Sequence, residues 1–317
     1  MITGARKLLS ECAQTRRHEK ILVISDTNYG YELSEIMMRA ASQLNINLTA
    51  IIMKPRLFPG EEPPASVVAA MKLSNVVICA TTMTMFYTKA RIAACRAGAR
   101  LISMAGATPS LLASNAMLVN FKEQQKLVKK VAANLTRASS VHVTTKQGTD
   151  LMLNISNRNG CAITGICAKP GEAQGVPDLE ACIAPIESST MGKLIVDAST
   201  SVTGLLRSPI ILEIQDGTVV RITGGAAANR LRAILRRVQD RNAWKVAEFG
   251  VGLNPLARLC GSIIEDEAVL GTAHLALGDN KPLGGNNKAP IHIDLVFKQP
   301  RVELDGALFM QGRRFIF

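Results

Sequence analysis

The stretch that decides the fold of the first part of the chain is "KILVISDTNYGYELSEIMMRAASQLNINLTAIIM", residues 20–53. Residues 20–26 form an apolar run that ends in a polar turn, and residues 32–45 carry apolar side chains at helical spacing. Residues 46–53 form a second apolar run. Strands that are apolar on both faces are typical of a parallel sheet covered by helices. The stretch therefore predicts a strand, a helix and a second, parallel strand.

The same alternation continues on the C-terminal side of this stretch. Helices are predicted at 64–74, 87–99 and 120–138, and strands at 75–82 and 100–106. Strands alternating with helices predict a parallel α/β domain, which we place at residues 1–139 and describe as Rossmann-like. No Gly-x-Gly-x-x-Gly motif follows the first strand, so the sequence gives no useful signal for a dinucleotide site.

The pattern of predicted helices and strands changes at residue 140, and Ser139 and Ser140 mark a short linker. Paired strands with Asp-Gly turns at 216–217 and 305–306 predict hairpins. A basic helix is predicted at 226–241 and a shorter helix near 255–269. We expect residues 140–317 to form an α+β, mostly antiparallel domain. The predicted fold class is thus α/β, with the N-terminal parallel sandwich domain followed by this second domain.

Composition narrows the functional classes. Of the 317 residues, 47% are hydrophobic and 20% are charged, as in globular proteins. No apolar run is long enough to span a membrane, and the seven cysteines are scattered without a Cys-x-x-Cys pair. We therefore expect a cytoplasmic protein with reduced thiols. The formal net charge of +12 suits an anionic partner, but 4% aromatic residues offer little for base stacking, so neither nucleic acid nor membrane is expected as a partner.

The segment "APIHIDLVF", residues 289–297, predicts the functional site. Residues two apart on a strand share one face, so His292 and Asp294 lie side by side among apolar neighbours. His274 lies in a similar apolar context. A buried carboxylate is costly unless it is paired or bound to a cation, which indicates a metal site in the second domain.

Two glutamates, Glu180 and Glu248, also stand in unexpectedly apolar surroundings. Two histidines and one carboxylate can hold iron(II) and leave positions open, whereas further carboxylates suit zinc, cobalt or manganese. The predicted cofactor is accordingly a divalent metal ion: zinc, cobalt, manganese or iron.

The segments "VAEFGVGLNP", "IIEDEAVLGTAHLALGDN", "GGNNKAPIHIDLVF" and "VELDGALF" resemble the metal-dependent leucyl aminopeptidases related to aminopeptidase T. A divergent branch of that superfamily contains 2,5-dihydroxypyridine dioxygenase, a ring-opening iron enzyme. The resemblance implies a homodimer and a set of metal ligands: Glu180, Glu248, His274, His292 and Asp294. Lys281 stands where the aminopeptidases have a ligating tyrosine, and Glu248 stands where the dioxygenase branch has a histidine.

Three functions follow as hypotheses. The leading one is an aminopeptidase-like metal-dependent hydrolase of a small peptide or amide, in which a metal-activated water attacks. Glu180 or Glu248 would act as general base and Lys281 would bind a carboxylate or stabilise an oxyanion. Substrate binding would fall to Thr88, Lys89 and Arg91. The alternatives are a non-haem iron(II) ring-opening dioxygenase similar to 2,5-dihydroxypyridine 5,6-dioxygenase, and a basic binding protein whose histidines are structural.

Overall fold

The computed structural model describes residues 1–317, and the chain forms two compact units. One unit contains Met1–Gln125 and Ile163–Asp178, and the other contains Lys126–Ala162 and Leu179–Phe317. Residues 163–178 therefore return to the first unit after the chain has entered the second. The domain boundary expected after residue 139 stays a prediction. The two units describe how the chain packs and do not test which parts of it fold independently.

The first unit is built on a five-stranded parallel sheet in the order β2-β1-β3-β4-β8. Its strands are β1 (Ile21–Asp26), β2 (Leu48–Met53), β3 (Val76–Ala80), β4 (Arg100–Ser103) and β8 (Ala173–Gly175). Its helices are α1 (Ile2–Lys7), a π-helix at Leu8–Cys12, α2 (Gly30–Gln43), α3 (Ala65–Lys72), α4 (Lys89–Arg96), α5 (Pro109–Ala113) and a 3-10 turn at Asn115–Leu118. The predicted parallel α/β fold is confirmed.

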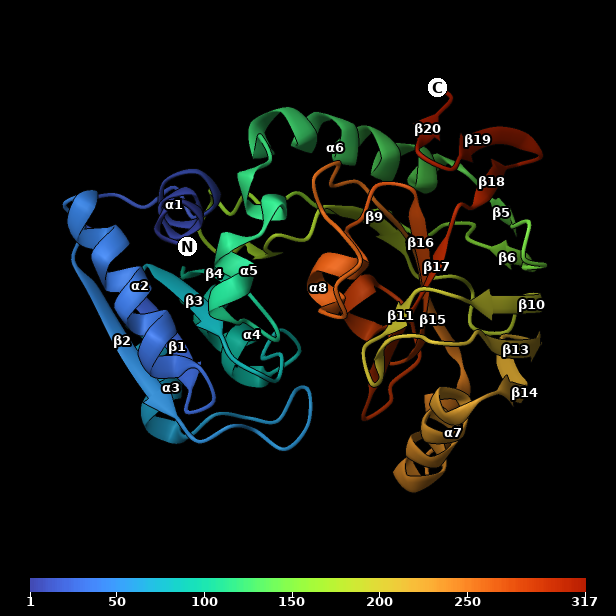
Figure 1. Ribbon diagram of the computed structural model, residues 1–317, viewed down its shortest axis with the longest axis horizontal. Coiled ribbons are helices and arrows are strands. Elements are labelled where there is room, and N and C mark those ends of the chain that lie inside the picture. Colours follow the sequence, from blue (N-terminus) through green and yellow to red (C-terminus); the bar gives the residue numbers. More distant parts are fainter. The chain divides into compact units, whose positions relative to one another are not determined.

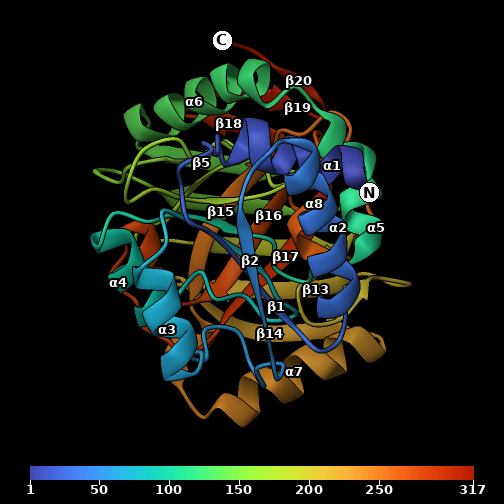
Figure 2. The same cartoon turned by 90° about the vertical axis from the view of Figure 1, so that its left-hand side faces the viewer.

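Helices cover both faces of this sheet. Helices α1, α2 and α5 pack together on one face, and α3 packs with α4 on the other (Figure 2). The core under α3 and α4 joins side chains of β1, β3 and β4, such as Ile24, Val77 and Leu101, to Met71 of α3 and Ala94 of α4. The unbroken apolar runs of the central strands are thus explained, because every residue of β1, β3 and β4 is buried, whereas the edge strand β2 is partly exposed.

The second unit contains two sheets (Figure 1). An eight-stranded sheet has the order β14-β13-β10-β6-β5-β18-β19-β20, and a seven-stranded sheet has the order β12-β11-β17-β16-β15-β9-β7. The first sheet consists of β5 (Ser140–Thr144), β6 (Asp150–Asn154), β10 (Met191–Val196), β13 (Ile210–Gln215), β14 (Thr218–Gly224), β18 (Arg301–Leu304), β19 (Ala307–Gln311) and β20 (Arg314–Phe315). The second consists of β7 (Cys161–Ile163), β9 (Glu180–Ile183), β11 (Ser199–Thr200), β12 (Gly204–Leu205), β15 (Val246–Gly252), β16 (Thr272–Gly278) and β17 (His292–Lys298).

Helices of the second unit are few, and its hairpins follow the predicted turn chemistry. They are α7 (Ala226–Val238), α8 (Ile263–Asp266) and 3-10 turns at Arg241–Trp244 and Lys281–Leu283, while α6 (Phe121–Arg137) spans the boundary of the two units. Asp216 and Gly217 both have positive φ, as do Asp305 and Gly306. Two-residue turns of this backbone shape match the twist of the strands they join, so the Asp-Gly signals locate both hairpins. The helix expected near 255–269 is limited to the four residues of α8.

None of the helices has the length and apolar content that a membrane-spanning segment needs. The cytoplasmic location expected from the sequence stays a prediction.

A buried ion pair joins β4 to the segment that precedes β1 in the first unit. Both guanidinium nitrogens of Arg100 on β4 donate to the Glu19 carboxylate, at 2.8 and 2.9 Å, and both side chains are buried. Burial by itself would raise the pKa of Glu19, but the hydrogen bonds from Arg100 and from the backbone of Arg16 bring that pKa below its ordinary value.

Replacing Arg100 by leucine should lower the free energy of unfolding of the first unit by about 3–5 kcal/mol, because the buried Glu19 charge loses its partner. The double variant Glu19→Leu/Arg100→Leu should recover much of the loss. Hydrogen exchange of the β1 and β4 amides measures both. Because the Glu19 pKa is lowered by folding, the contribution of the pair is present above the unfolded carboxyl pKa of about 4.3 and is lost as the pH falls through the lower folded value. Equal losses in the single and double variants would contradict this account.

Candidate metal centre

One face of the seven-stranded sheet gathers the predicted metal ligands. Four neighbouring strands, in the order β17-β16-β15-β9, carry them. Cross-strand partners share a face, and the register pairs His292 with Gly278, Asp294 with Ala276, and His274 with Gly250. Glu248 also pairs with Ala276, and Glu180 pairs with Gly252. All five ionisable side chains therefore point to the same side, and their partners are glycines or alanine except for Val296, which pairs with His274 on β17.

These small partners make room for the functional groups. A Cβ atom added at Gly250 would lie 2.2 Å from both Cε1 and Nε2 of His274. The space that a side chain at position 250 would fill is thus occupied by the imidazole of the neighbouring strand. The strand β15 tolerates this glycine because Gly250 is flanked by buried Phe249 and Val251.

The five groups form a chain of short contacts. Nε2 of His274 lies 3.2 Å from Glu180 Oε2 and 3.6 Å from Glu248 Oε1. Nε2 of His292 lies 3.0 Å from Glu248 Oε2 and 3.2 Å from Asp294 Oδ1. Glu248 therefore stands between the two imidazoles. His274, Glu248 and Glu180 are only 1%, 4% and 6% exposed, so water screens these charges little.

Mutual attraction outweighs burial in this centre. Burial would lower the pKa of His274, yet the Glu180 and Glu248 carboxylates raise that pKa to about 9. Burial would likewise lower the pKa of His292, but Asp294 and Glu248 raise it well above its ordinary value. Burial would raise the pKa of Glu248, whereas hydrogen bonds from both imidazoles bring it well below its ordinary range. Three carboxylates thus require positive charge, supplied by imidazole protons or by a cation that displaces them.

The donor set fits a divalent metal ion. Ligand atoms of Glu248, His292 and Asp294 all lie within 4.8 Å of one another. Nδ1 of His292 donates to the carbonyl of Asp279 at 2.7 Å, which leaves Nε2 facing the carboxylates. A histidine that ligates a metal commonly has its other ring nitrogen bound in this way. Glu248, His292 and Asp294 would therefore hold the ion, with His274 and Glu180 adjoining.

The structure places the other predicted site residues elsewhere. Lys281 lies in the 3-10 turn at Lys281–Leu283 with an exposed side chain, and its backbone N–H donates to Asp279. Its assignment to catalysis stays a prediction.

The predicted substrate-binding residues lie at the start of α4 in the first unit. The buried Thr88 is the N-cap of α4, and its hydroxyl accepts a hydrogen bond from the backbone of Arg91. The Arg91 guanidinium stacks over the ring of Phe86, 5.0 Å from its centroid, and the backbone N–H of Lys89 donates to Glu62. These contacts account for the start of the helix, and the substrate-binding role of Thr88, Lys89 and Arg91 stays a prediction.

A polar network that the sequence did not reveal supports the metal centre. Glu187 accepts hydrogen bonds from Arg158 at 2.8 Å, from the Asn280 amide at 3.1 Å and from the backbone N–H of Asn286 at 2.5 Å. Arg158 also donates to the carbonyl of Gly284 at 2.7 Å. These bonds fix the loop that follows Asp279, whose carbonyl orients His292.

Within this loop, the side chains of two buried asparagines hold the backbone in place through hydrogen bonds. Asn280 accepts a hydrogen bond from the Asn287 backbone at 2.7 Å, and the Asn287 amide donates to the carbonyls of Gly278 and Asn242. A Cβ atom at Gly285 would lie 2.1 to 2.3 Å from the Asn280 side-chain amide. The Gly-Gly-Asn-Asn run is the only sequence signal, because buried asparagines are uncommon without such bonds.

Comparison with known proteins places the chain among metalloenzymes. A family model described as 2,5-dihydroxypyridine 5,6-dioxygenase matches residues 1–316. A curated 2,5-dihydroxypyridine 5,6-dioxygenase of Pseudomonas putida KT2440 is 25% identical over 248 residues, which cover 74% of this chain and 69% of that protein.

Solved structures share the fold. The 2,5-dihydroxypyridine dioxygenase of Pseudomonas putida KT2440 superposes with a TM-score of 0.83 at 20% identity, over 99% of this chain and 96% of that one. Wild-type AmpT of Thermus thermophilus superposes with a TM-score of 0.70 at 13% identity, over 100% of this chain and 98% of that one. At these identities the likeness concerns the fold alone.

Adding a methyl group at position 250 should displace the His274 ring. We expect Gly250→Ala to weaken the binding of a divalent ion at least about tenfold, or roughly 1.4 kcal/mol, measured by competition with a chelating dye. Gly225→Ala is the matched control, since its added Cβ meets only the flexible Ser208 hydroxyl. Unchanged metal affinity in Gly250→Ala, with a native circular dichroism spectrum, would show that the ring position does not matter.

Weakening the hydrogen bonds of Glu187 should lower the metal affinity, because the loop that they fix orients His292. We expect Glu187→Ala to reduce metal affinity about 10–100-fold, and Glu187→Gln to fall between it and the unmodified protein, because glutamine keeps one acceptor oxygen. Glu213→Ala removes a glutamate from an exposed ion pair with Arg221 and serves as control. Equal affinity for the Glu187→Ala and Glu213→Ala proteins would refute the link.

Proposed function

We propose, from the premise that this chain belongs to the 2,5-dihydroxypyridine 5,6-dioxygenase family, that it is a non-haem iron(II) enzyme that opens a hydroxylated pyridine ring with dioxygen. The match of the family model over residues 1–316 is the observation that carries the proposal. The 2,5-dihydroxypyridine activity of the Pseudomonas putida relative supports a dihydroxypyridine as the first substrate to test.

Family membership corrects one expectation and confirms another. The aminopeptidase-like hydrolase expected from the sequence is wrong, because the family model and the curated relative are both dioxygenases, and the likeness to AmpT extends only to the fold. The expected divalent metal cofactor is confirmed, since this dioxygenase family is metal-dependent and the buried donor set fits such an ion. The chain therefore belongs to a family of enzymes, and the hypothesis of a binding protein without activity is set aside.

The residues of the centre have distinct parts in this proposal. Glu248, His292 and Asp294 would hold iron(II), which would supply the electrons that make dioxygen reactive and would leave positions open for substrate. The backbone carbonyl of Asp279 accepts a hydrogen bond from Nδ1 of His292, so that Nε2 would be directed at the ion. Glu180, on the far side of His274, is suited to accept the proton of a substrate hydroxyl, because a carboxylate next to an imidazole can pass that proton on.

The ligand environment departs from the branch in one respect that shapes the proposal. Glu248 stands where the dioxygenase branch is expected to have a histidine, so the proposed ligand set of Glu248, His292 and Asp294 carries two carboxylates rather than one. A more negative donor set stabilises the higher charge of an oxidised ion, which favours electron donation to dioxygen. The partners expected from the sequence, a small-molecule substrate and a second copy in a homodimer, remain proposals.

Oxygen uptake tests the proposal directly. Protein loaded anaerobically with iron(II) should consume dioxygen with 2,5-dihydroxypyridine, and the pyridine absorbance should disappear at the same rate. Asp294→Asn should lower the rate at least about 100-fold, equivalent to about 2.7 kcal/mol, because a carboxylate ligand is lost. Asp216→Asn is the control, since Asp216 lies in an exposed turn whose positive φ asparagine also tolerates.

The proposal fails if no hydroxylated pyridine supports oxygen uptake by the iron-loaded protein. It also fails if the Asp294→Asn protein consumes oxygen as fast as the Asp216→Asn protein.

A further inference from the structure

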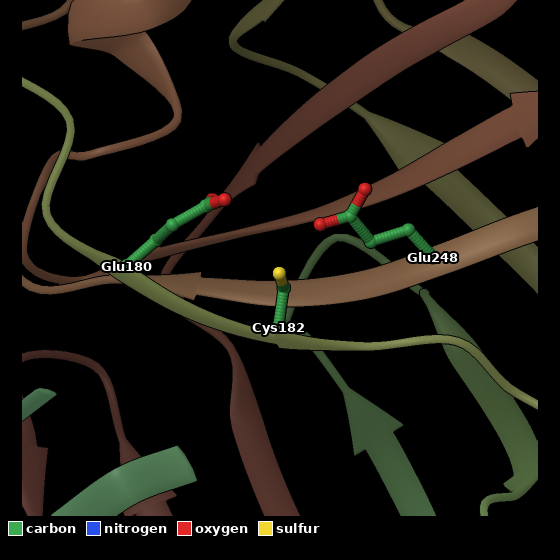
Figure 3. A group of neighbouring side chains, drawn as sticks. All are labelled: Glu180, Cys182 and Glu248. Carbon is green, nitrogen blue, oxygen red and sulfur yellow. The ribbon is translucent and has the colours of Figure 1, made fainter. Parts of the chain in front are cut away.

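A cysteine side chain lies among the acidic groups of the metal centre. Cys182 follows Glu180 by two residues on β9 and therefore shares its face. The register pairs Cys182 with Gly250, which in turn pairs with His274. Figure 3 shows the carboxylates of Glu180 and Glu248 pointing toward each other and the sulfur of Cys182 pointing into the space between them. Cys182 is only 1% exposed.

The spacing of these groups suits coordination of one ion. Ligand atoms of Glu180, Cys182 and Glu248 lie within 4.8 Å of one another. Zinc binds sulfur at about 2.3 Å and carboxylate oxygen at about 2.0–2.2 Å, so donors that share one tetrahedral ion lie about 3.3–3.8 Å apart. Side-chain rotations that shorten these separations by about an ångström would bring the three donors onto a common ion.

The surroundings of Cys182 differ from those of an ordinary buried cysteine. A free cysteine in a protein core is usually packed against apolar side chains and behaves as a small hydrophobic residue. Cys79 of β3 is such a residue, inside the apolar core of the first unit. Cys182 instead faces two buried carboxylates, and its cross-strand partner Gly250 presents no side chain to it. The negative charge of the carboxylates favours a cation, and a cation bound by both carboxylates would lie near the sulfur of Cys182.

We propose that Cys182 is a sulfur donor of the metal centre, which joins Glu180 and Glu248 in binding a thiophilic divalent ion such as cobalt, zinc or cadmium. Binding breaks the S–H bond of Cys182 and forms a sulfur–metal bond, and the proton passes to solvent without any transfer of electrons. Cys161 lies on β7, the strand next to β9 in the seven-stranded sheet.

This inference goes beyond the ring-opening reaction, because it concerns only which ions the centre accepts. Sulfur ligands favour soft ions, whereas the imidazoles and carboxylates of the same centre also suit iron(II). Glu248 belongs both to the group with Glu180 and Cys182 and to the group with His292 and Asp294. A thiophilic ion and iron(II) therefore compete for Glu248. Zinc or cadmium at this position would therefore weaken the binding of iron.

Cobalt spectroscopy tests the assignment without any assay of activity. Metal-free protein should receive one equivalent of cobalt(II) under anaerobic conditions. A sulfur ligand gives a thiolate-to-cobalt charge-transfer band in the near ultraviolet, and the visible d–d bands report that cobalt is bound. We expect the charge-transfer band in the unmodified protein, and its loss in Cys182→Ser with the visible bands retained. Cys79→Ser, at a buried thiol in the first unit, should keep both.

An absent band in the unmodified protein, or a band that persists in Cys182→Ser, would overturn the proposal. X-ray absorption of the unmodified zinc-loaded protein decides the matter if the Cys182→Ser variant does not fold. A sulfur shell at about 2.3 Å supports the assignment, and a shell of oxygen and nitrogen alone rejects it. Neither measurement depends on oxygen uptake, so failure of the proposed reaction would leave this result unaffected.

Discussion

Charge balance on one face of the seven-stranded sheet is the constraint on which the functional part of the structure depends. Three carboxylates, from Glu180, Glu248 and Asp294, point into a region from which water is largely excluded. Such a grouping is stable only if imidazolium protons or a metal ion compensate it. The small residues opposite them, Gly250 and Ala276 among others, and the loop fastened by Glu187 all serve to hold these charges at contact distance.

The features of this site that follow from local strand periodicity could be predicted from the sequence. The two-residue period of a strand places His292 beside Asp294, and the apolar runs identify the strands that hold them. What could not be predicted is the pairing of β9 with β15, because it joins Glu180 to residues about seventy positions away, and no local pattern encodes that register. The Asn280 network was missed for a related reason: its residues read as an ordinary polar turn, and only the tertiary structure buries them. The cost of adding a methyl at Gly250 likewise becomes visible only when the neighbouring strand is in place.

The correction from hydrolase to dioxygenase shows what a set of ligands can and cannot determine. Carboxylates and imidazoles on one sheet face limit the metal to a few divalent ions, and that expectation is confirmed. The reaction depends in addition on the open positions and on the groups that meet the substrate, which strand periodicity does not reveal. The likeness to AmpT and to the Pseudomonas putida dioxygenase structure concerns the fold, which by itself does not specify a reaction. The whole-length family match carried the information that the individual motifs lacked.

The fifth strand of the parallel sheet has a consequence for how the chain is made. Strand β8 pairs with β4 through Leu101 and Ala173, although the intervening residues include the first three strands of the other unit. A nascent chain leaving the ribosome therefore presents an unpaired β4 edge until residue 175 has emerged, which at 5–20 residues per second is several seconds after β4 itself. Exposed sheet edges invite association with other chains. Chaperone protection during translation thus matters most in that interval, and a fragment that ends before β8 carries the same open edge permanently.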